Sequence, residues 1–451
     1  MKKLLLIILA QLFCSVFAIT ETSALEYTNI DFWKKFKDEI LVNNIQKSIE
    51  NNPDLKIAIL KVKESEKIVK MSLASELPAI DFSGMAGKEF SSSDIKMGSV
   101  TIKNYNQTRF LLPFEVNYEI DIWGKNRLKT KSRKVTQKIF EQDKKASYII
   151  LTTSVACDYY NLIKIDKLLE LENENCDLAV KFLTLTENRE KIGLSSKDDV
   201  LEAKEKVLQI KSDINELSKR KEIIENQLAY LLGDKFFNEI KRSDFVNTVN
   251  IDKIPSDLNS EIILNRPDVV CASENITRAN YDARIAKKEL LPSFTISGTF
   301  GWNGYNNLAG IFKNRTGLAQ VFVMPTWNIF DGGKRFHFMK LKQLELEQAH
   351  KEYEKAVLAS LQEVNDNLAV LKNEDKNYKI SKDILNIQNE KLNLKIGDKL
   401  FGLSSDIDVI LYKQIKLQAD KQLTNNKINQ IISYINLYRA VGGYDFSEET
   451  I

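Results

Sequence analysis

Two hydrophobic patterns follow each other along the chain, one with the period of a helix and one with the period of a strand. In residues 357–371 the apolar side chains recur alternately four and three positions apart, which is the seam of a coiled coil. In residues 114–122 apolar and polar residues alternate, so the two kinds of side chain would lie on opposite faces of a strand. The chain is therefore predicted to be a mixed α and β protein with long helices and a few strands.

The same order of patterns occurs twice. The sequence GLSSKDDV at 193–200 returns as GLSSDIDV at 402–409, displaced by 209 positions. Each copy lies between two long helix-patterned segments, so each is predicted to be the tip of an antiparallel helical hairpin. Proline pairs at 53 and 78 and at 267 and 292 have the same separation of 25 residues. The chain is predicted to be an internal two-fold repeat.

The repeat sets the predicted domain plan. A polar stretch at 91–108 has the composition of an exposed loop. The predicted parts are a signal peptide at 1–24 with cleavage after residue 18 or 24, a first repeat at 25–233, a connector at 234–258 and a second repeat at 259–445. Each repeat holds a helix, a strand pair (79–90 with 110–123, and 293–303 with 318–330) and a hairpin (126–232 and 335–441).

The N-terminus has the pattern of a secretory signal. Lys2 and Lys3 precede an apolar stretch at 4–17, which is too short for a membrane anchor. Cys14 leaves lipidation open as an alternative, although Gln11 and Phe13 fit poorly before a modified cysteine. The remaining cysteines have no metal-like spacing and are predicted to be buried free thiols; they are Cys157, Cys176 and Cys271.

Composition narrows the function classes. The chain has 65 basic and 62 acidic residues, a net charge of +3, which argues against a nucleic-acid binder. Beyond the signal there is no run of 18 apolar residues, so no transmembrane helix is expected. Four strands cannot close a membrane barrel, so any barrel would be shared between subunits. No cofactor or metal motif and no catalytic motif is present, and His337 and His350 are expected to be solvated, so the chain is predicted not to be an enzyme.

Several motifs in order carry a family resemblance. They are NRPDV at 265–269, YEIDIWGKNR at 118–127, WNIFDGGK at 327–334 and the two GLSS turns. With these motifs the chain resembles the TolC-like outer membrane efflux proteins of Gram-negative bacteria, and within them the OprM/NodT-type branch.

The resemblance implies an architecture, a location and partners. It implies a homotrimer in which each protomer gives four strands to a twelve-stranded β-barrel in outer-membrane lipid. The barrel would continue as a periplasmic α-helical coiled-coil tunnel. A periplasmic adaptor (membrane fusion) protein and an inner-membrane transporter would complete a tripartite system. The chain would be a passive exit duct for small molecules, with all energy coupling in the pump.

The resemblance also assigns site residues. The hairpin tips would contact the adaptor, through Gly193, Leu194, Ser195, Gly402, Leu403 and Ser404. A turn role remains open beside this one, with the glycines at positive φ and the serines capping the next helix. The closed periplasmic entrance would be narrowed by Asp406, Asp408 and Leu411. A helix-cap role for either aspartate, and a hydrophobic ring at Leu411, remain open. Charged strand residues would line the barrel lumen: Glu115, Glu119 and Asp121.

Two other functions remain open at this point. A duct for type I protein secretion would share the architecture. A periplasmic coiled-coil adaptor or scaffold would explain the hairpins, but it would leave the four alternating strands without a purpose.

Overall fold

The computed structural model describes residues 30–446, except 235–239, 246–247, 250, 252–254, 256–259 and 313–315. The predicted signal peptide, with Cys14, lies outside the described residues, as do parts of the connector at 234–258. The chain divides into two compact units. The first, here called the sheet unit, holds Asp54–Ser147 and Ser260–Glu363. The second, here called the hairpin unit, holds the described residues of Met1–Pro53, Tyr148–Asn259 and Val364–Ile451.

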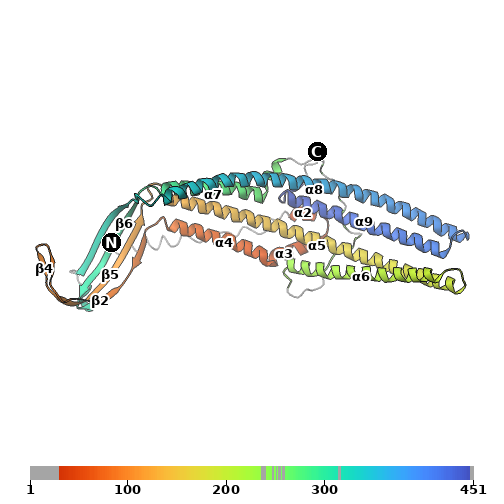
Figure 1. The fold of residues 1–451 in the computed structure, drawn as a ribbon, viewed down its shortest axis with the longest axis horizontal. Helices are drawn as coiled ribbons and strands as arrows, with labels where there is room; N and C mark the ends of the chain where they lie inside the picture. The colour runs from red at the N-terminus through yellow and green to blue at the C-terminus, as the bar shows by residue number, and fades with distance from the viewer. Residues whose placement is uncertain are drawn as a thin grey trace. The chain divides into compact units, whose positions relative to one another are not determined.

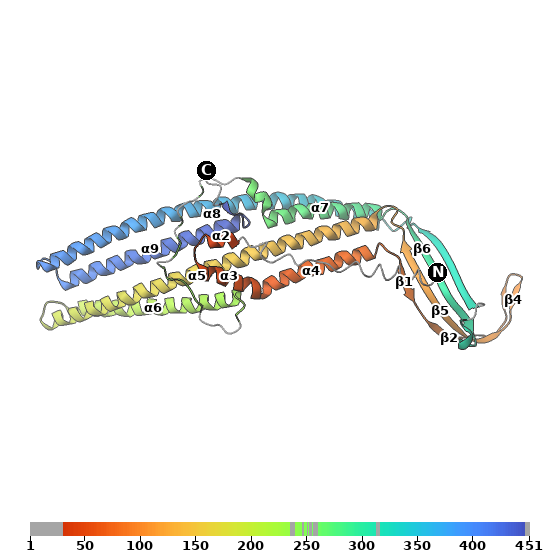
Figure 2. The same ribbon diagram turned by 180° about the vertical axis from the view of Figure 1, so that it is seen from behind.

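The sheet unit is built around one antiparallel sheet. Its strands lie in the order β1-β5-β6-β7, and β2 also pairs with β5 (Figures 1 and 2). The bounds are β1 Ala79–Phe82, β2 Met85–Ser91, β5 Tyr105–Glu119, β6 Ser293–Tyr305 and β7 Gly317–Thr326. Strands far apart in sequence therefore meet directly, since β5 of the first half pairs with β6 of the second.

The two faces of this sheet have different chemistry. Phe82, Phe114 and Phe300 lie opposite one another in register, with ring centroids 4.8 and 5.2 Å apart. On the other face, Glu115 lies between Asp81 and Thr299 in register. The alternation seen in the sequence is therefore an alternation between an aromatic face and a polar face.

The strands differ from the predicted ranges in a physically simple way. The strand expected at 110–123 runs from Tyr105 to Glu119, because the residues after Glu119 turn into the next helix. The range 79–90 is interrupted between β1 and β2. The stretch at 91–108, expected to be a loop, contains a two-stranded ribbon of β3 Ile95–Met97 and β4 Val100–Ile102. Apolar and polar residues alternate there over only three positions on each side of Gly98 and Ser99, which is shorter than the run that indicates a strand.

Two shorter helices and the first parts of two long ones complete the sheet unit. They are α4 Pro53–Ala74, α7 Pro267–Lys288, α5 Lys125–Lys191 and α8 Lys334–Leu400. Short 3-10 helices lie at Ser260–Asn265 and Leu308–Gly310. Among the residues that the structure describes, no helix is both long enough and apolar enough to span a membrane.

The hairpin unit contains the rest of α5 and α8, each paired with a helix that follows its turn. These are α6 Lys197–Leu231 and α9 Asp406–Ala440, with α2 Ile30–Lys34 and α3 Glu39–Asn51 beside them. Both long helices have 67 residues and both following helices have 35. Each of these four boundaries recurs at the displacement of 209 seen in the sequence.

The core of the hairpin unit lies around α9, which both views show between α8 and α5 (Figures 1 and 2). Ile410 and Leu417 of α9 pack in one buried cluster with Leu171 and Leu178 of α5. Near the C-terminal end of α9, Tyr438 stacks on Phe32 of α2 with ring centroids 3.8 Å apart. Helix α2 is therefore held on α9 by aromatic packing.

Candidate functional site

The two hairpin tips end in the same way. In the first, the Gly193 N–H donates to the Glu190 carbonyl at 2.9 Å and the Leu194 N–H donates to the Arg189 carbonyl at 2.8 Å. This bonding pattern is a Schellman motif, which places its glycine in the left-handed region, and Gly193 has φ 78°. The second tip repeats the pattern at Gly402 with φ 74°.

The helix after each tip begins with a capping box. Ser196 accepts from the Asp199 N–H at 3.0 Å, while the Asp199 carboxylate accepts from the Ser196 N–H at 2.7 Å. Ser405 and Asp408 form the same pair, at 3.2 and 2.8 Å. The capping residue is thus the second serine of each GLSS motif. Ser195 and Ser404, the predicted contact residues, precede the cap.

Large apolar side chains are exposed at both tips. In a Schellman motif the residue after the glycine commonly packs back onto the helix, but Leu194 is 64% exposed and Leu403 is 77% exposed. The other exposed apolar residues of the tips are Ile192, Leu400 and Phe401. An exposed apolar end on a charged hairpin is the kind of surface that partners bind.

The residues predicted to narrow the entrance lie in three different environments. Asp406 forms an ion pair with Lys399 across the turn. Asp408 is the acidic partner of Ser405 in the capping box of its helix, and hydrogen bonds from the side chain and then the backbone of Ser405 hold its pKa below the ordinary value. Leu411 is 41% exposed. The cap role left open for the aspartates thus falls on Asp408 in this chain.

Leu411 lies in a cavity of about 520 Å³ at the tip end of the hairpin unit. Glu202, which is displaced from Leu411 by 209 positions, lines the same cavity. The walls come from α5, α6 and α9, and include Arg189, Asp199, Lys206 and Ile407. The structure thus brings together two equivalent positions of the repeat that carry different side chains.

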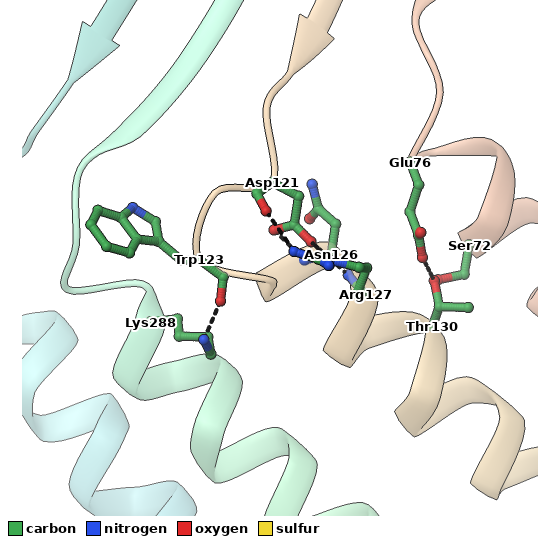
Figure 3. A network of polar contacts seen from close by, with 8 residues as sticks. All are labelled: Ser72, Glu76, Asp121, Trp123, Asn126, Arg127, Thr130 and Lys288. Atoms are coloured by element: carbon green, nitrogen blue, oxygen red, sulfur yellow. Dashed lines mark hydrogen bonds and ion pairs between the residues drawn. The ribbon is translucent and has the colours of Figure 1, made fainter.

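The residues predicted to line a lumen do not share one strand. Glu115 is an exposed strand residue on the polar face. Glu119 ends β5 and forms an ion pair with Lys125 at 2.7 Å. Asp121 lies beyond the strand, where its carboxylate accepts from the Asn126 and Arg127 N–H groups at 3.1 and 3.0 Å (Figure 3). The placement of Asp121 on a strand face was wrong, because its carboxylate satisfies the free N–H groups at the start of α5.

The junction between sheet and helices is held by further polar contacts. Thr130 of α5 bonds to Glu76 and, at 2.9 Å, to Ser72 of α4. Lys288 of α7 donates to the Trp123 carbonyl (Figure 3). These contacts fix the directions in which α4, α5 and α7 leave the sheet.

A serine cap after each tip was expected from the sequence, and the structure places it at the second serine of each motif, Ser196 and Ser405. The cavity shared by Leu411 and Glu202 was not inferred, because it depends on how two hairpins pack.

Comparison with known proteins identifies the class. The family model for outer membrane efflux proteins matches residues 44–234 and 258–443. The chain therefore belongs to the outer membrane efflux protein family, and the resemblance seen in the sequence is confirmed.

Curated relatives and solved structures agree. The solvent efflux pump outer membrane protein SrpC of Pseudomonas putida is 24% identical over 412 residues, which are 90% of this chain and 86% of that protein. The cation efflux system protein CusC of Escherichia coli K12 is 21% identical, covering 92% and 89%. The Campylobacter jejuni CmeC outer membrane channel has the same fold, with a TM-score of 0.84 at 22% identity over 96% and 91% of the two chains.

The chain is thus an outer-membrane channel protein whose helical hairpins lie in the periplasm. Its family works with an adaptor and an inner-membrane pump in tripartite systems, and it is a family of channels rather than enzymes.

Proposed function

We propose that three copies of this chain form one passive exit duct, with a twelve-stranded β-barrel continued by a helical tunnel. The proposal rests mainly on the two edge strands of the sheet, each of which is paired on one side alone within the described chain. Among the described strands, β1 pairs only with β5 and β7 only with β6. Apolar residues at both edges are exposed, among them Ile80 at 65% and Val321 at 75%. Unpaired edges of this kind require a neighbouring strand in lipid, and a copy of the same chain supplies it.

The duct would be built from an internally duplicated chain, with repeats at 25–233 and 259–445 joined at 234–258. Equal helix lengths, equal tip geometry and the common displacement of 209 support the duplication. With two hairpins per chain, three chains give six tips. The trimer has three-fold symmetry, while the tips alternate between two sequence types.

We assign adaptor binding to the tips. The exposed Leu194 and Leu403 sit on rigid Schellman turns, which present them without a large loss of entropy on binding. Ser195 and Ser404 provide hydroxyl groups beside them. Backbone geometry accounts for both glycines, so their part in the contact is to shape the turn.

We assign the closed entrance to the second hairpin, at Asp406, Asp408 and Leu411. Leu411 takes the leading part, because it is exposed to a cavity and has no capping role. Three copies of Leu411 would form an apolar constriction. Asp408 would add negative charge there through the carboxylate oxygen that the capping box does not use, if that oxygen faces the opening.

The cargo is assigned to small molecules rather than to proteins. The relatives are named for the efflux of solvents, toluene, antibiotics and cations. Glu115 and Asp81 on the polar face would line the water-filled barrel, and a polar lumen suits small solutes of varied chemistry.

The experiment is single-channel conductance of the purified protein in planar bilayers. Wild type is compared with Asp408→Ala, Leu411→Ser and the matched control Asp199→Ala. Asp199→Ala removes the same capping box from the other hairpin, so any effect of lost capping is common to both aspartate variants.

We expect a stable pore in wild type, a higher conductance in Leu411→Ser, and in Asp199→Ala only the effect of the lost capping box. A change in Asp408→Ala beyond the control would place Asp408 in the opening. A protein that makes no pore contradicts the duct. A pore unaffected by Leu411→Ser keeps the duct and contradicts the entrance assignment.

A further inference from the structure

Positive charge is concentrated where the helices of the sheet unit meet the sheet. The whole chain is nearly balanced in charge, yet residues 125–138 contain seven cations and no acidic residue, and residues 334–344 contain four cations and none. Neither α5 nor α8 has an acidic residue in its first turn. Cations at a helix N-terminus oppose the macrodipole, so helix stability does not account for them.

These cations divide between two opposite faces of the helices. One face lines a groove of about 760 Å³ that crosses α4, α5, α7 and α8. There the cations Lys129, Arg133 and Lys342 lie among acids, and Lys342 pairs with Glu345 at 2.8 Å. The groove face therefore has mixed charge.

On the other face of α5, α7 and α8, the charged residues nearest the sheet are all cations. At 3.6 residues per turn, Lys131 and Lys134 lie on the side of α5 opposite its groove residues, and Arg284 and Lys287 do the same on α7. With Lys340 of α8, these exposed cations are here called the basic belt. Within the described part of the chain, none of the five forms a salt bridge with an acidic side chain. The first acids on this side of α5 and α8 are Glu141 and Glu347, which lie further from the sheet.

The belt is close to the end of each helix that joins the sheet. At 1.5 Å per residue, its members lie within about 14 Å of those ends. Electrostatic attraction by a charged surface extends over about 8–10 Å at physiological salt, beyond the reach of the side chains themselves. The belt is therefore near enough to act on a membrane surface at the end of the sheet.

A second, independent observation points to a membrane surface at that end. Trp123 and Trp327 follow β5 and β7, are 39% and 59% exposed, and donate their indole N–H groups to the Pro292 and Leu290 carbonyls at 2.7 and 3.2 Å. Phe330, close to Trp327, is 87% exposed. Exposed tryptophans with an apolar body and a satisfied polar edge are typical of the membrane–water interface.

We propose that the basic belt binds the phosphate groups of anionic phospholipids in the periplasmic leaflet of the outer membrane. This inference rests on the proposed function, because it requires the sheet to cross that membrane. The aromatic residues fix the depth of the sheet, and the belt, the next charged layer along the helices, holds anionic headgroups at the junction. Clusters of cations directly beside a membrane-spanning segment recognise such lipids.

The test compares the full-length protein with two variants of equal charge change. The belt variant carries Lys131→Gln, Lys134→Gln, Arg284→Gln, Lys287→Gln and Lys340→Gln. The control carries Lys181→Gln, Lys204→Gln, Lys211→Gln, Lys382→Gln and Lys413→Gln, which are exposed lysines of the hairpin unit. Each protein is placed in bilayers of equal phosphatidylcholine and phosphatidylglycerol and then extracted in detergent, and the retained lipid of each kind is counted by native mass spectrometry.

Wild type and control are expected to retain phosphatidylglycerol over phosphatidylcholine, and about 1 M salt should abolish the preference. The belt variant should retain at least about fivefold less phosphatidylglycerol, the factor expected from the loss of even one effective cation. Should the belt variant fail to fold, Lys131→Gln with Lys134→Gln is measured in its place. Equal retention by belt variant and wild type, or equal loss in the control, overturns the inference.

Conductance of the same preparations separates this inference from the proposed function. If wild type and belt variant both conduct, and the belt variant retains as much phosphatidylglycerol as wild type, only the lipid site is contradicted. If the ion selectivity of the belt variant changes while its lipid retention does not, the cations lie in the pore. That result would also overturn the lipid site. A wild type that makes no pore contradicts the proposed function and the inference together.

Discussion

The helices α6 and α9 are equivalent in the repeat but have very different surroundings. Both have 35 residues, both begin with a Ser–Asp capping box, and both follow a Schellman turn. Thirteen residues of α9 are buried, whereas five residues of α6 are buried. The local signals that start a helix have been kept in both copies, while packing against α5 and α2 makes α9 the centre of its unit and leaves α6 at the flank.

The comparison separates two kinds of stabilisation. Capping and turn geometry depend on a few neighbouring residues, so they should contribute equally in both copies. Burial depends on the whole unit, so it should differ at equivalent positions. Four sets of substitutions test this division, and their expected effects decrease from the ion pair through the leucines and the caps to Asp158.

The largest effect is expected at an ion pair that only α9 has. Lys421 of α9 pairs with Glu172 of α5, and their side chains are 16% and 7% exposed. Lys421→Ala leaves a buried carboxylate without its partner and should lower the free energy of unfolding by about 3–5 kcal/mol. Glu172→Leu with Lys421→Met should recover most of the loss. Denaturant unfolding of the detergent-purified protein measures both.

The matched control for the ion pair is Ser212→Ala, because Ser212 of α6 is equivalent to Lys421 and is exposed. It should change the free energy of unfolding by less than about 0.5 kcal/mol. If Lys421→Ala were as mild as this control, the pair would not contribute to the position of α9.

A leucine pair gives the cleanest contrast, because residue type is held constant. Leu417 of α9 is 1% exposed, and its equivalent in α6, Leu208, is 59% exposed. Leu417→Ala should cost about 2–5 kcal/mol through lost burial and a cavity. Leu208→Ala should cost less than about 0.5 kcal/mol. Equal losses in thermal unfolding would show that α6 is buried in the assembled protein, and would break the comparison.

The caps should behave alike. Ser196→Ala and Ser405→Ala should each destabilise the first turn of their helix by about 1 kcal/mol, measured by hydrogen exchange of those turns. Hydrogen bonds from the serines lower the pKa of both Asp199 and Asp408. A lowered carboxyl pKa gives stability that is present above the unfolded-state pKa of about 4 and is lost as the pH falls through the folded-state pKa. The difference between wild type and each variant should therefore shrink in acid.

The smallest effect is expected at Asp158 of α5, whose equivalent in α8 is Asn367. Burial raises the pKa of Asp158 to about 6. Because the folded state holds this proton more tightly than the unfolded state, stability is highest below pH 4 and falls as the pH rises through about 6. Asp158→Asn should raise the unfolding temperature by about 1–2 °C at pH 8 and leave it unchanged at pH 4. A fall at pH 8 would show that the charged form is stabilised.

The same division explains what could be predicted from the sequence. The helices after the tips begin at 197 and 406, directly after Ser196 and Ser405, whose capping signal is local and can be seen in the sequence. The end of β5 could not be placed, because Asp121 continues the polar alternation of Glu115 and Glu119 while its carboxylate caps α5. The burial of α9 could not be predicted either, because Leu417 and Leu208 occupy the same place in the same pattern. Only tertiary packing distinguishes them.

The proposed trimer requires three copies to join at the edges of the sheet, and cross-linking of those edges is the decisive experiment. Asp81→Cys on β1 is combined with Gln320→Cys on β7, or with Phe322→Cys one pleat away, in a chain whose other cysteines are serine. These positions share one face of the sheet, and each chain carries both edges. Oxidation in the outer membrane should give covalent dimers and trimers and nothing larger. A ladder that continues beyond three chains, or monomers alone for both pairs, would contradict the account.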